Sequence, residues 1–262
     1  MHILDKIVAH KKEEVKASKD KVSIKDLEST TLFSKQGNSL AQSIKDSELG
    51  IISEFKRRSP SKPTINLDAK VSEIVTHYTQ AGVSGISILT DSHFFGGSSE
   101  DLKDARRIVE TPLLRKEFVI DEYQIIEAKS IGADAILLIT EILTMEEVKS
   151  FAALAKSLGM DTLLEVHTEA QLSKYTSDID IIGVNNRDLT TFKVDPQHSA
   201  RLFSKLPTEA VKISESGIHD PDTIQMLQQT GFDGFLIGER FMKTMDPGKA
   251  CQDFIQSIMA KV

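Results

Sequence analysis

The sequence contains little cysteine and no long apolar run, and each shortage excludes a class of protein. Among its 262 residues Cys251 is the single cysteine, so no disulfide can form within the chain, as is usual in a reducing compartment. No stretch approaches the ~20 apolar residues that a membrane-spanning helix needs, and the N-terminal segment lacks the core of a signal peptide. We therefore expect a cytoplasmic protein that has no membrane partner.

The chain also lacks an excess of positive charge. It has 32 Lys and Arg against 39 Asp and Glu, which gives a net charge of −7. Such a balance argues against nucleic acid as a partner. A site for an anionic ligand would have to be a local basic cluster in an acidic background.

A strand–helix pattern repeats eight times along the chain. Short apolar runs occur at 50–55, 85–90, 112–119, 134–140, 162–167, 180–185, 210–216 and 234–239. The stretches between them have the pattern of amphipathic helices, several of which end in glycine; Asp220 and Pro221 fit a helix cap followed by the first helical residue. Eight such units in a chain of this length predict an α/β fold, a closed (β/α)8 TIM barrel. A doubly wound open sheet is the alternative, less favoured because no G-x-G-x-x-G follows the first strand.

The chain divides into two segments without a linker between them. Residues 1–48 are expected to form an N-terminal helical extension, because Ile3, Leu4, Ile7 and Val8 recur at helical spacing. Residues 49–262 are expected to form the barrel. No low-complexity tract or second core separates the two, so we expect a single domain overall.

Polar side chains gather where the predicted strands end. In this fold the active site lies at the carboxyl ends of the strands, and charged groups beside apolar strand interiors are costly unless they are paired or functional. Alternation along a strand places Glu54 and Lys56 on one face, and Lys116 on the face of Phe118. With Glu165 these residues predict an active site; a structural ion pair of Lys116 and Glu165 at the rim is the alternative.

Other polar residues are expected to have structural roles. His167 is expected to be a structural histidine whose ring is hydrogen-bonded, since nothing pairs it with a nucleophile. Arg57 and Arg58 are expected in a mobile, solvated loop, and Arg115 and Glu117 are expected to point outward to helices. The glycine-rich loop at 94–102 lacks the Lys-Ser/Thr ending of a P-loop, so we expect a turn before a helix there.

Two glycines after the last strands predict a phosphate site. Barrels often bind phosphate with the loops after strands seven and eight and a helix N-terminus. Gly217 and Gly238 stand at these places, where backbone N–H groups can approach a ligand closely. Lys56 and Ser59 are expected to reach the same phosphate.

Seven segments, in this order along the chain, resemble indole-3-glycerol phosphate synthase. They are SEFKRRSPSKPTIN, ILTDSHFFGGSSEDL, LLRKEFVIDEYQIIEAKSIGADAILLI, LLEVHTEAQL, IIGVNNRDLTTFKVD, ISESGI and FLIGERFM. The resemblance implies a (β/α)8 carbon–carbon lyase (carboxy-lyase) of tryptophan biosynthesis. This family converts 1-(2-carboxyphenylamino)-1-deoxyribulose 5-phosphate into indole-3-glycerol phosphate, CO2 and water. It uses no organic cofactor and no metal, and we expect a monomer or weak homodimer.

The resemblance also implies the site residues. The catalytic set is Glu54, Lys56, Lys116, Glu165, Asn185 and Ser216. The substrate- and phosphate-binding set is Ser59, Gly217, Gly238, Glu239, Arg187, Phe95, Phe118 and Leu189, with Lys56 shared between the two sets. Lys116 would be the acid toward a ketone oxygen and Glu165 the general base. Asn185 would hydrogen-bond Glu165 or a substrate hydroxyl.

The sequence departs from the family at two places and leaves two other functions open. Glu117 stands where the family often has aspartate, at a position that points outward. Pro63 stands where a glycine is common, and it would stiffen the first loop. A different phosphosugar barrel, such as an isomerase, and a non-catalytic barrel that binds a phosphate ligand are the alternatives, because a fold does not fix a function.

Overall fold

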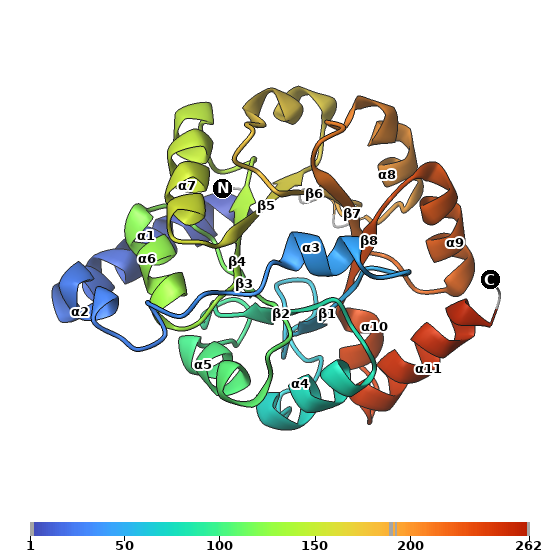
Figure 1. Cartoon of the computed structure of the whole chain (residues 1–262), viewed down its shortest axis with the longest axis horizontal. Coiled ribbons are helices and arrows are strands. Elements are labelled where there is room, and N and C mark those ends of the chain that lie inside the picture. The colour runs from blue at the N-terminus through green and yellow to red at the C-terminus, as the bar shows by residue number, and fades with distance from the viewer. Residues whose placement is uncertain (1–2, 189–190, 192, 261–262) are drawn as a thin grey trace.

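Eight parallel strands close into a barrel (Figure 1). The computed structural model describes residues 3–188, 191 and 193–260. The strands are β1 (Ile51–Phe55), β2 (Gly85–Leu89), β3 (Leu113–Lys116), β4 (Ala135–Ile139), β5 (Asp161–Val166), β6 (Ile181–Asn185), β7 (Val211–Glu215) and β8 (Gly234–Ile237). They pair in chain order, and β8 pairs with β1. The predicted (β/α)8 fold is confirmed.

Helices form a ring outside the strands (Figure 1). They are α4 (Val71–Gln80), α5 (Ser99–Ile108), α6 (Glu122–Ser130), α7 (Met145–Ser157), α8 (Gln197–Leu202), α9 (Pro221–Thr230), α10 (Glu239–Met242) and α11 (Pro247–Met259). Two 3-10 segments, η1 (Glu169–Lys174) and η2 (Phe203–Lys205), lie after β5 and α8. None of the described helices is long and apolar enough to cross a membrane.

The boundaries of α9 show how local sequence sets a helix. The Asp220 side chain accepts a hydrogen bond from the backbone N–H of Thr223, and Pro221 is the first helical residue. At the other end Gly231 has φ 117°, a left-handed conformation that glycine adopts without a steric penalty. The predicted cap and stop are confirmed.

Three helices precede β1, and they reach opposite ends of the barrel. They are α1 (Ile3–Lys21), α2 (Ile24–Glu28) and α3 (Leu40–Lys45). Leu40 and Ile44 of α3 pack against the barrel interior, so α3 closes the end where the strands begin; Figure 1 looks onto α3 across this end. Leu4 and Ile7 of α1 line a pocket at the other end.

Apolar residues form two layers around the sheet. Inside the barrel the layer includes Ile52, Leu114, Leu137, Leu163, Ile181, Ile213 and Leu236. The larger layer lies between the strands and the helices. Inward-facing residues near the start of each strand therefore fill the barrel interior. The next inward-facing residue along the strand reaches the open end of the barrel, where the strands end.

Candidate active site

An open pocket lies at the carboxyl ends of the strands. Each strand contributes to its lining, with Glu54, Leu89, Lys116, Leu137, Glu165, Asn185, Glu215 and Leu236. The wall also includes residues of α1 and of the loops after β1, β7 and β8. The pocket thus occupies the place where enzymes of this fold hold their substrates.

Five charged side chains form what we call the inner cluster: Glu54, Lys56, Lys116, Glu165 and Glu215. Lys116 Nζ lies 2.6 Å from Glu215 Oε2 and 3.5 Å from Glu165 Oε2. Lys56 forms an ion pair with Glu54. The predicted residues from β1, β3 and β5 therefore meet in one place, together with a carboxylate from β7.

The strand register and two glycines make room for the inner cluster. Glu165 is paired with Gly183, which lies on the neighbouring strand β6. A Cβ atom on Gly183 would lie 2.1 Å from Glu215 Oε1, and one on Gly238 would lie 2.5 Å from Glu54 Oε1. Any larger residue at these two positions would collide with a carboxylate of the site.

The charges of the cluster hold Lys116 as an ammonium ion. Burial alone would lower the pKa of Lys116, but the carboxylates of Glu215, Glu165 and Glu54 outweigh it and raise the pKa above its usual value. Burial would likewise raise the pKa of Glu54, and the ammonium groups of Lys56 and Lys116 bring it below its usual value. Lys116 is thus cationic at neutral pH.

Glu215 is a residue of the site that the sequence reasoning did not select. Burial raises the pKa of Glu215 to about 7; Lys116 opposes this shift and the nearby Glu165 adds to it. The physical cause is that three carboxylates face only two ammonium groups in a space shielded from water. The sequence pattern could have revealed it, because Glu215 follows Val211 and Ile213 at a spacing of two residues and so shares their inward face.

Two more predicted catalytic residues lie beside the cluster. Asn185 Nδ2 donates a hydrogen bond to Glu165 Oε1 at 3.1 Å, one of the two partners expected for it. Ser216 lines the pocket and has φ 69°, a left-handed conformation that is uncommon outside glycine and is often found at functional sites.

The residues predicted to hold phosphate lie together on one side of the pocket. Ser59, Gly217, Gly238 and Glu239 all line it, and Glu239 is the first residue of α10. Glu239 forms an ion pair with Lys62 of the loop after β1. This ion pair connects the loop after β1 with the start of α10.

Aromatic rings form another part of the wall. The centroids of Phe95 and Phe118 lie 5.8 Å apart, and both residues line the pocket together with Arg187. This places the predicted aryl-binding residues next to Lys116 on β3. Leu189, the remaining predicted binding residue, lies outside the described residues.

The prediction of a mobile, solvated loop is wrong for Arg57 and Arg58. Arg57 makes two hydrogen bonds of 2.6 and 2.8 Å to Asp101 at the start of α5, and its guanidinium lies 4.7 Å from the Phe55 ring centroid. Arg58 donates to the backbone carbonyls of Ser92 and His93. The loop after β1 packs on α5 and the loop after β2, which supply these acceptors.

The prediction of a hydrogen-bonded His167 ring is also wrong, whereas the prediction that Arg115 and Glu117 point outward is confirmed. Within the described part of the chain both ring nitrogens of His167 are buried without a hydrogen-bond partner, and Nε2 lies 3.5 Å from Glu165 Oε1. Arg115 points outward and pairs with Glu127 of α6. Glu117 also points outward, toward α1.

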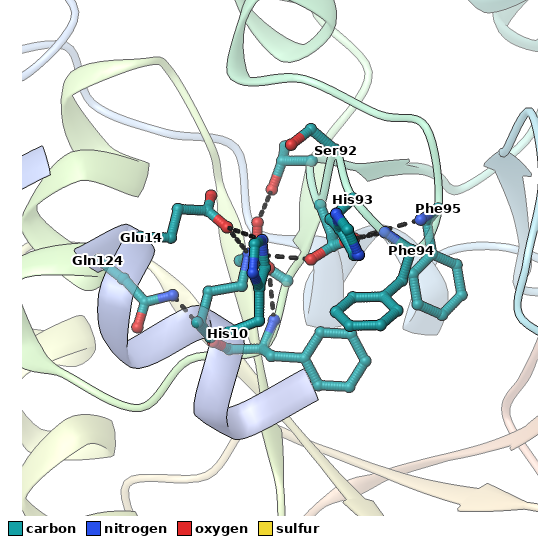
Figure 2. A network of polar contacts seen from close by, with 12 residues as sticks. His10, Glu14, Ser92, His93, Phe94, Phe95 and Gln124 are labelled. Carbon is teal, nitrogen blue, oxygen red and sulfur yellow. Dashed lines mark hydrogen bonds and ion pairs between the residues drawn. The ribbon is translucent and has the colours of Figure 1, made fainter. Parts of the chain in front are cut away.

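A second cluster of charges joins α1 to the barrel, and we call it the outer cluster: the buried Lys11, Asp91 and Glu117 together with the partly exposed Glu14. Lys11 Nζ lies 2.9 Å from Glu14, 3.0 Å from Asp91 and 2.9 Å from Glu117. Figure 2 shows the surrounding network, with His10 and Glu14 on one side and Ser92–Phe95 on the other. The outer cluster fixes the helix whose Leu4 and Ile7 complete the pocket wall.

Comparisons with known proteins agree with this geometry. The sequence model of indole-3-glycerol phosphate synthase matches residues 4–254. The chain is 47% identical to indole-3-glycerol phosphate synthase of Bacteroides thetaiotaomicron over 98% of both chains. It is 41% identical to that of Caldanaerobacter subterraneus, again over 98% of both.

Solved structures of low sequence identity share the fold. The 3-hexulose-6-phosphate synthase of Salmonella typhimurium superposes with a TM-score of 0.64 at 11% identity, covering 82% of this chain and 100% of that one. Thiamine phosphate pyrophosphorylase of Pyrococcus furiosus gives a TM-score of 0.61 at 15% identity, covering 85% and 98%. This likeness concerns the architecture alone.

The closed barrel and the charged pocket at its carboxyl end define a (β/α)8-barrel enzyme. The family match extends over nearly the whole chain, and the two relatives are 47% and 41% identical to it. The chain belongs to the indole-3-glycerol phosphate synthase family.

Proposed function

We propose that the chain converts 1-(2-carboxyphenylamino)-1-deoxyribulose 5-phosphate into indole-3-glycerol phosphate, CO2 and water. This is a carbon–carbon lyase reaction of the carboxy-lyase type. The observation that carries the proposal is the inner cluster, in which two lysines face three glutamates inside one pocket. The reaction needs acids and a base within reach of one small substrate, and the cluster provides them.

Lys116 is the proposed acid of the ring closure. The ring carbon that bears the substrate carboxylate attacks the C2 carbonyl, and negative charge develops on the carbonyl oxygen. An ammonium group beside this oxygen stabilises the charge and donates a proton. Glu215, at 2.6 Å, and Glu165 hold Lys116 in place from two sides.

Decarboxylation and dehydration complete the reaction. Departure of CO2 leaves its bonding electron pair on the ring, and the C2 hydroxyl then leaves as water with a proton from a second acid. Glu165 is the proposed base that takes a proton from the substrate C1 methylene, the carbon next to the nitrogen, as the indole double bond forms, and the nitrogen keeps its hydrogen. Lys56, paired with Glu54, is proposed as the partner of the substrate carboxylate or as the second acid.

The phosphate of the substrate is proposed to bind between the loops after β7 and β8. Gly217 and Gly238 allow close approach of backbone N–H groups, and α10 begins directly after Gly238. Ser59 and Lys56 complete this side, while Phe95, Phe118 and Arg187 would contact the aryl and ribulose parts. Ser216 is proposed as a further hydrogen-bonding group of the site.

A product assay of the purified chain tests the proposal. Incubation with the carboxyphenylamino-deoxyribulose phosphate should yield fluorescent indoleglycerol phosphate and CO2 in equal amounts. Interconversion of an aldose and a ketose phosphate without CO2 would instead support a phosphosugar isomerase. A calorimetric titration that shows binding without CO2 release would support a non-catalytic barrel.

Three expectations from the sequence stay predictions. The protein is expected to act in the cytoplasm, as a monomer or weak homodimer. It is expected to need no metal or organic cofactor. Gel filtration at several protein concentrations tests the oligomeric state. Activity after exhaustive chelation tests whether a metal is needed.

A further inference from the structure

We propose that His167 is a positioning residue for Glu165, the general base in the proposed function on which this inference rests. His167 is the first residue after β5 and shares the inward face with Glu165. Its Nε2 atom lies 3.5 Å from Glu165 Oε1, and its side chain is 13% exposed. Its ring therefore lies against the carboxylate at the rim of the pocket.

The two oxygens of Glu165 have different surroundings. Asn185 Nδ2 donates to Oε1 at 3.1 Å, and His167 approaches the same oxygen. Lys116 lies on the side of Oε2, at 3.5 Å. A hold on Oε1 from two residues restricts rotation of the carboxylate, so Oε2 is the atom left to accept a proton from the substrate.

The ring of His167 is free to serve this purpose. Both nitrogens are buried, and neither has a hydrogen-bond partner among the described residues. An imidazole nitrogen that faces a carboxylate oxygen can direct an N–H group at that oxygen. The separation of 3.5 Å is long for a hydrogen bond, and a small movement of either side chain would bring Nε2 within hydrogen-bond distance of Oε1.

The backbone of His167 is fixed from both sides. Its N–H donates to Gln171 Oε1 at 2.6 Å, and its carbonyl lies 2.7 Å from His198 Nε2. These contacts orient the main chain without using the ring. The main chain thus holds the His167 ring next to Glu165, although the ring makes no structural hydrogen bond of its own. An effect on Glu165 accounts for this placement.

The test compares His167→Phe with His167→Gln. Phenylalanine keeps the ring and removes both nitrogens, so kcat should fall by about 10- to 100-fold while KM stays near the wild-type value. Glutamine can place an amide N–H where Nε2 lies, and it should restore most of kcat. The exposed His77 of α4 provides a matched control, His77→Phe, with wild-type kcat.

Stability separates positioning from a structural role. His167→Phe removes two buried, unpaired polar atoms, so its unfolding midpoint should equal or exceed that of the wild type. A wild-type kcat in His167→Phe overturns the inference, as does a joint loss of stability and activity that glutamine does not restore. A wild-type chain that releases no CO2 overturns the proposed function as well, which tells the two failures apart.

Discussion

The inner and outer clusters both surround one lysine with three carboxylates. Lys116 faces Glu54, Glu165 and Glu215, and Lys11 faces Glu14, Asp91 and Glu117. Their access to the pocket differs, because the Lys116 side chain is 15% exposed and that of Lys11 is 1% exposed. The inner cluster also holds a second cation, Lys56, and a carboxyl group with a raised pKa.

Residues that follow each other in sequence belong to different clusters. Lys116 points into the barrel and Glu117 points out toward α1, since consecutive side chains of a strand face opposite sides. Similar sets of charges thus acquire different roles through the face on which they lie. The lysines of the inner cluster line the pocket, whereas Lys11 of the outer cluster connects α1 to the barrel.

The largest expected effect is the loss of turnover in Lys116→Met. Without the ammonium group no acid faces the ketone oxygen, so kcat should fall below detection while substrate binding largely persists. Steady-state assays and calorimetric titration measure the two quantities. Near-normal turnover in this variant would refute the role of Lys116.

Glu165→Gln should lower kcat by about 10²- to 10⁴-fold, the usual contribution of a general base. The amide keeps the shape of the side chain but cannot accept the proton. Pre-steady-state kinetics should show that the chemical step is slowed. A change confined to KM would mean that Glu165 only binds the substrate.

Lys11→Met should act on stability and leave the chemistry in place. Removal of Lys11 leaves buried carboxylates without their cation, which costs about 3–5 kcal/mol. Denaturant unfolding measures the loss. The matched control is Lys103→Ala, whose pair with Glu100 is exposed and contributes less than about 1 kcal/mol; equal midpoints for the two variants would contradict the account.

Glu215→Gln should change how stability depends on pH. In the wild type the pKa of Glu215 is about 7, against an ordinary value of 4.5, so the folded state binds more protons than the unfolded state between these values. Stability therefore falls as pH rises through this window. The variant lacks this loss, so its advantage over the wild type should grow from about pH 4.5 to 7; unfolding curves at several pH values check it.

The strand pattern allowed the barrel and much of the site to be predicted from the sequence. Alternation indicated that Glu54, Lys56 and Lys116 face inward, and the closed fold brings the ends of β1, β3 and β5 together. These successes depend on periodicity, which is a local property of the chain. Asn185 was expected from the family resemblance, with Glu165 as one of two possible partners, and it donates to Glu165.

The missed features depend on contacts between distant segments. Lys11 reaches Asp91 and Glu117 only because α1 docks on the barrel, and helical periodicity does not specify the docking position. Arg57 finds Asp101 through the fold of a loop. Glu215 was overlooked because alternation along a strand shows which face a charged side chain lies on, but not which residues of other strands it contacts.

The central claim is tested most directly by comparing the turnover of Lys116→Met with that of Lys11→Met. Both rates are measured at saturating substrate and expressed per folded molecule. CO2 and indoleglycerol phosphate should form at near wild-type rates with Lys11→Met and at no measurable rate with Lys116→Met. Equal losses in the two variants, or turnover by Lys116→Met, would contradict the assignment of the chemistry to the inner cluster.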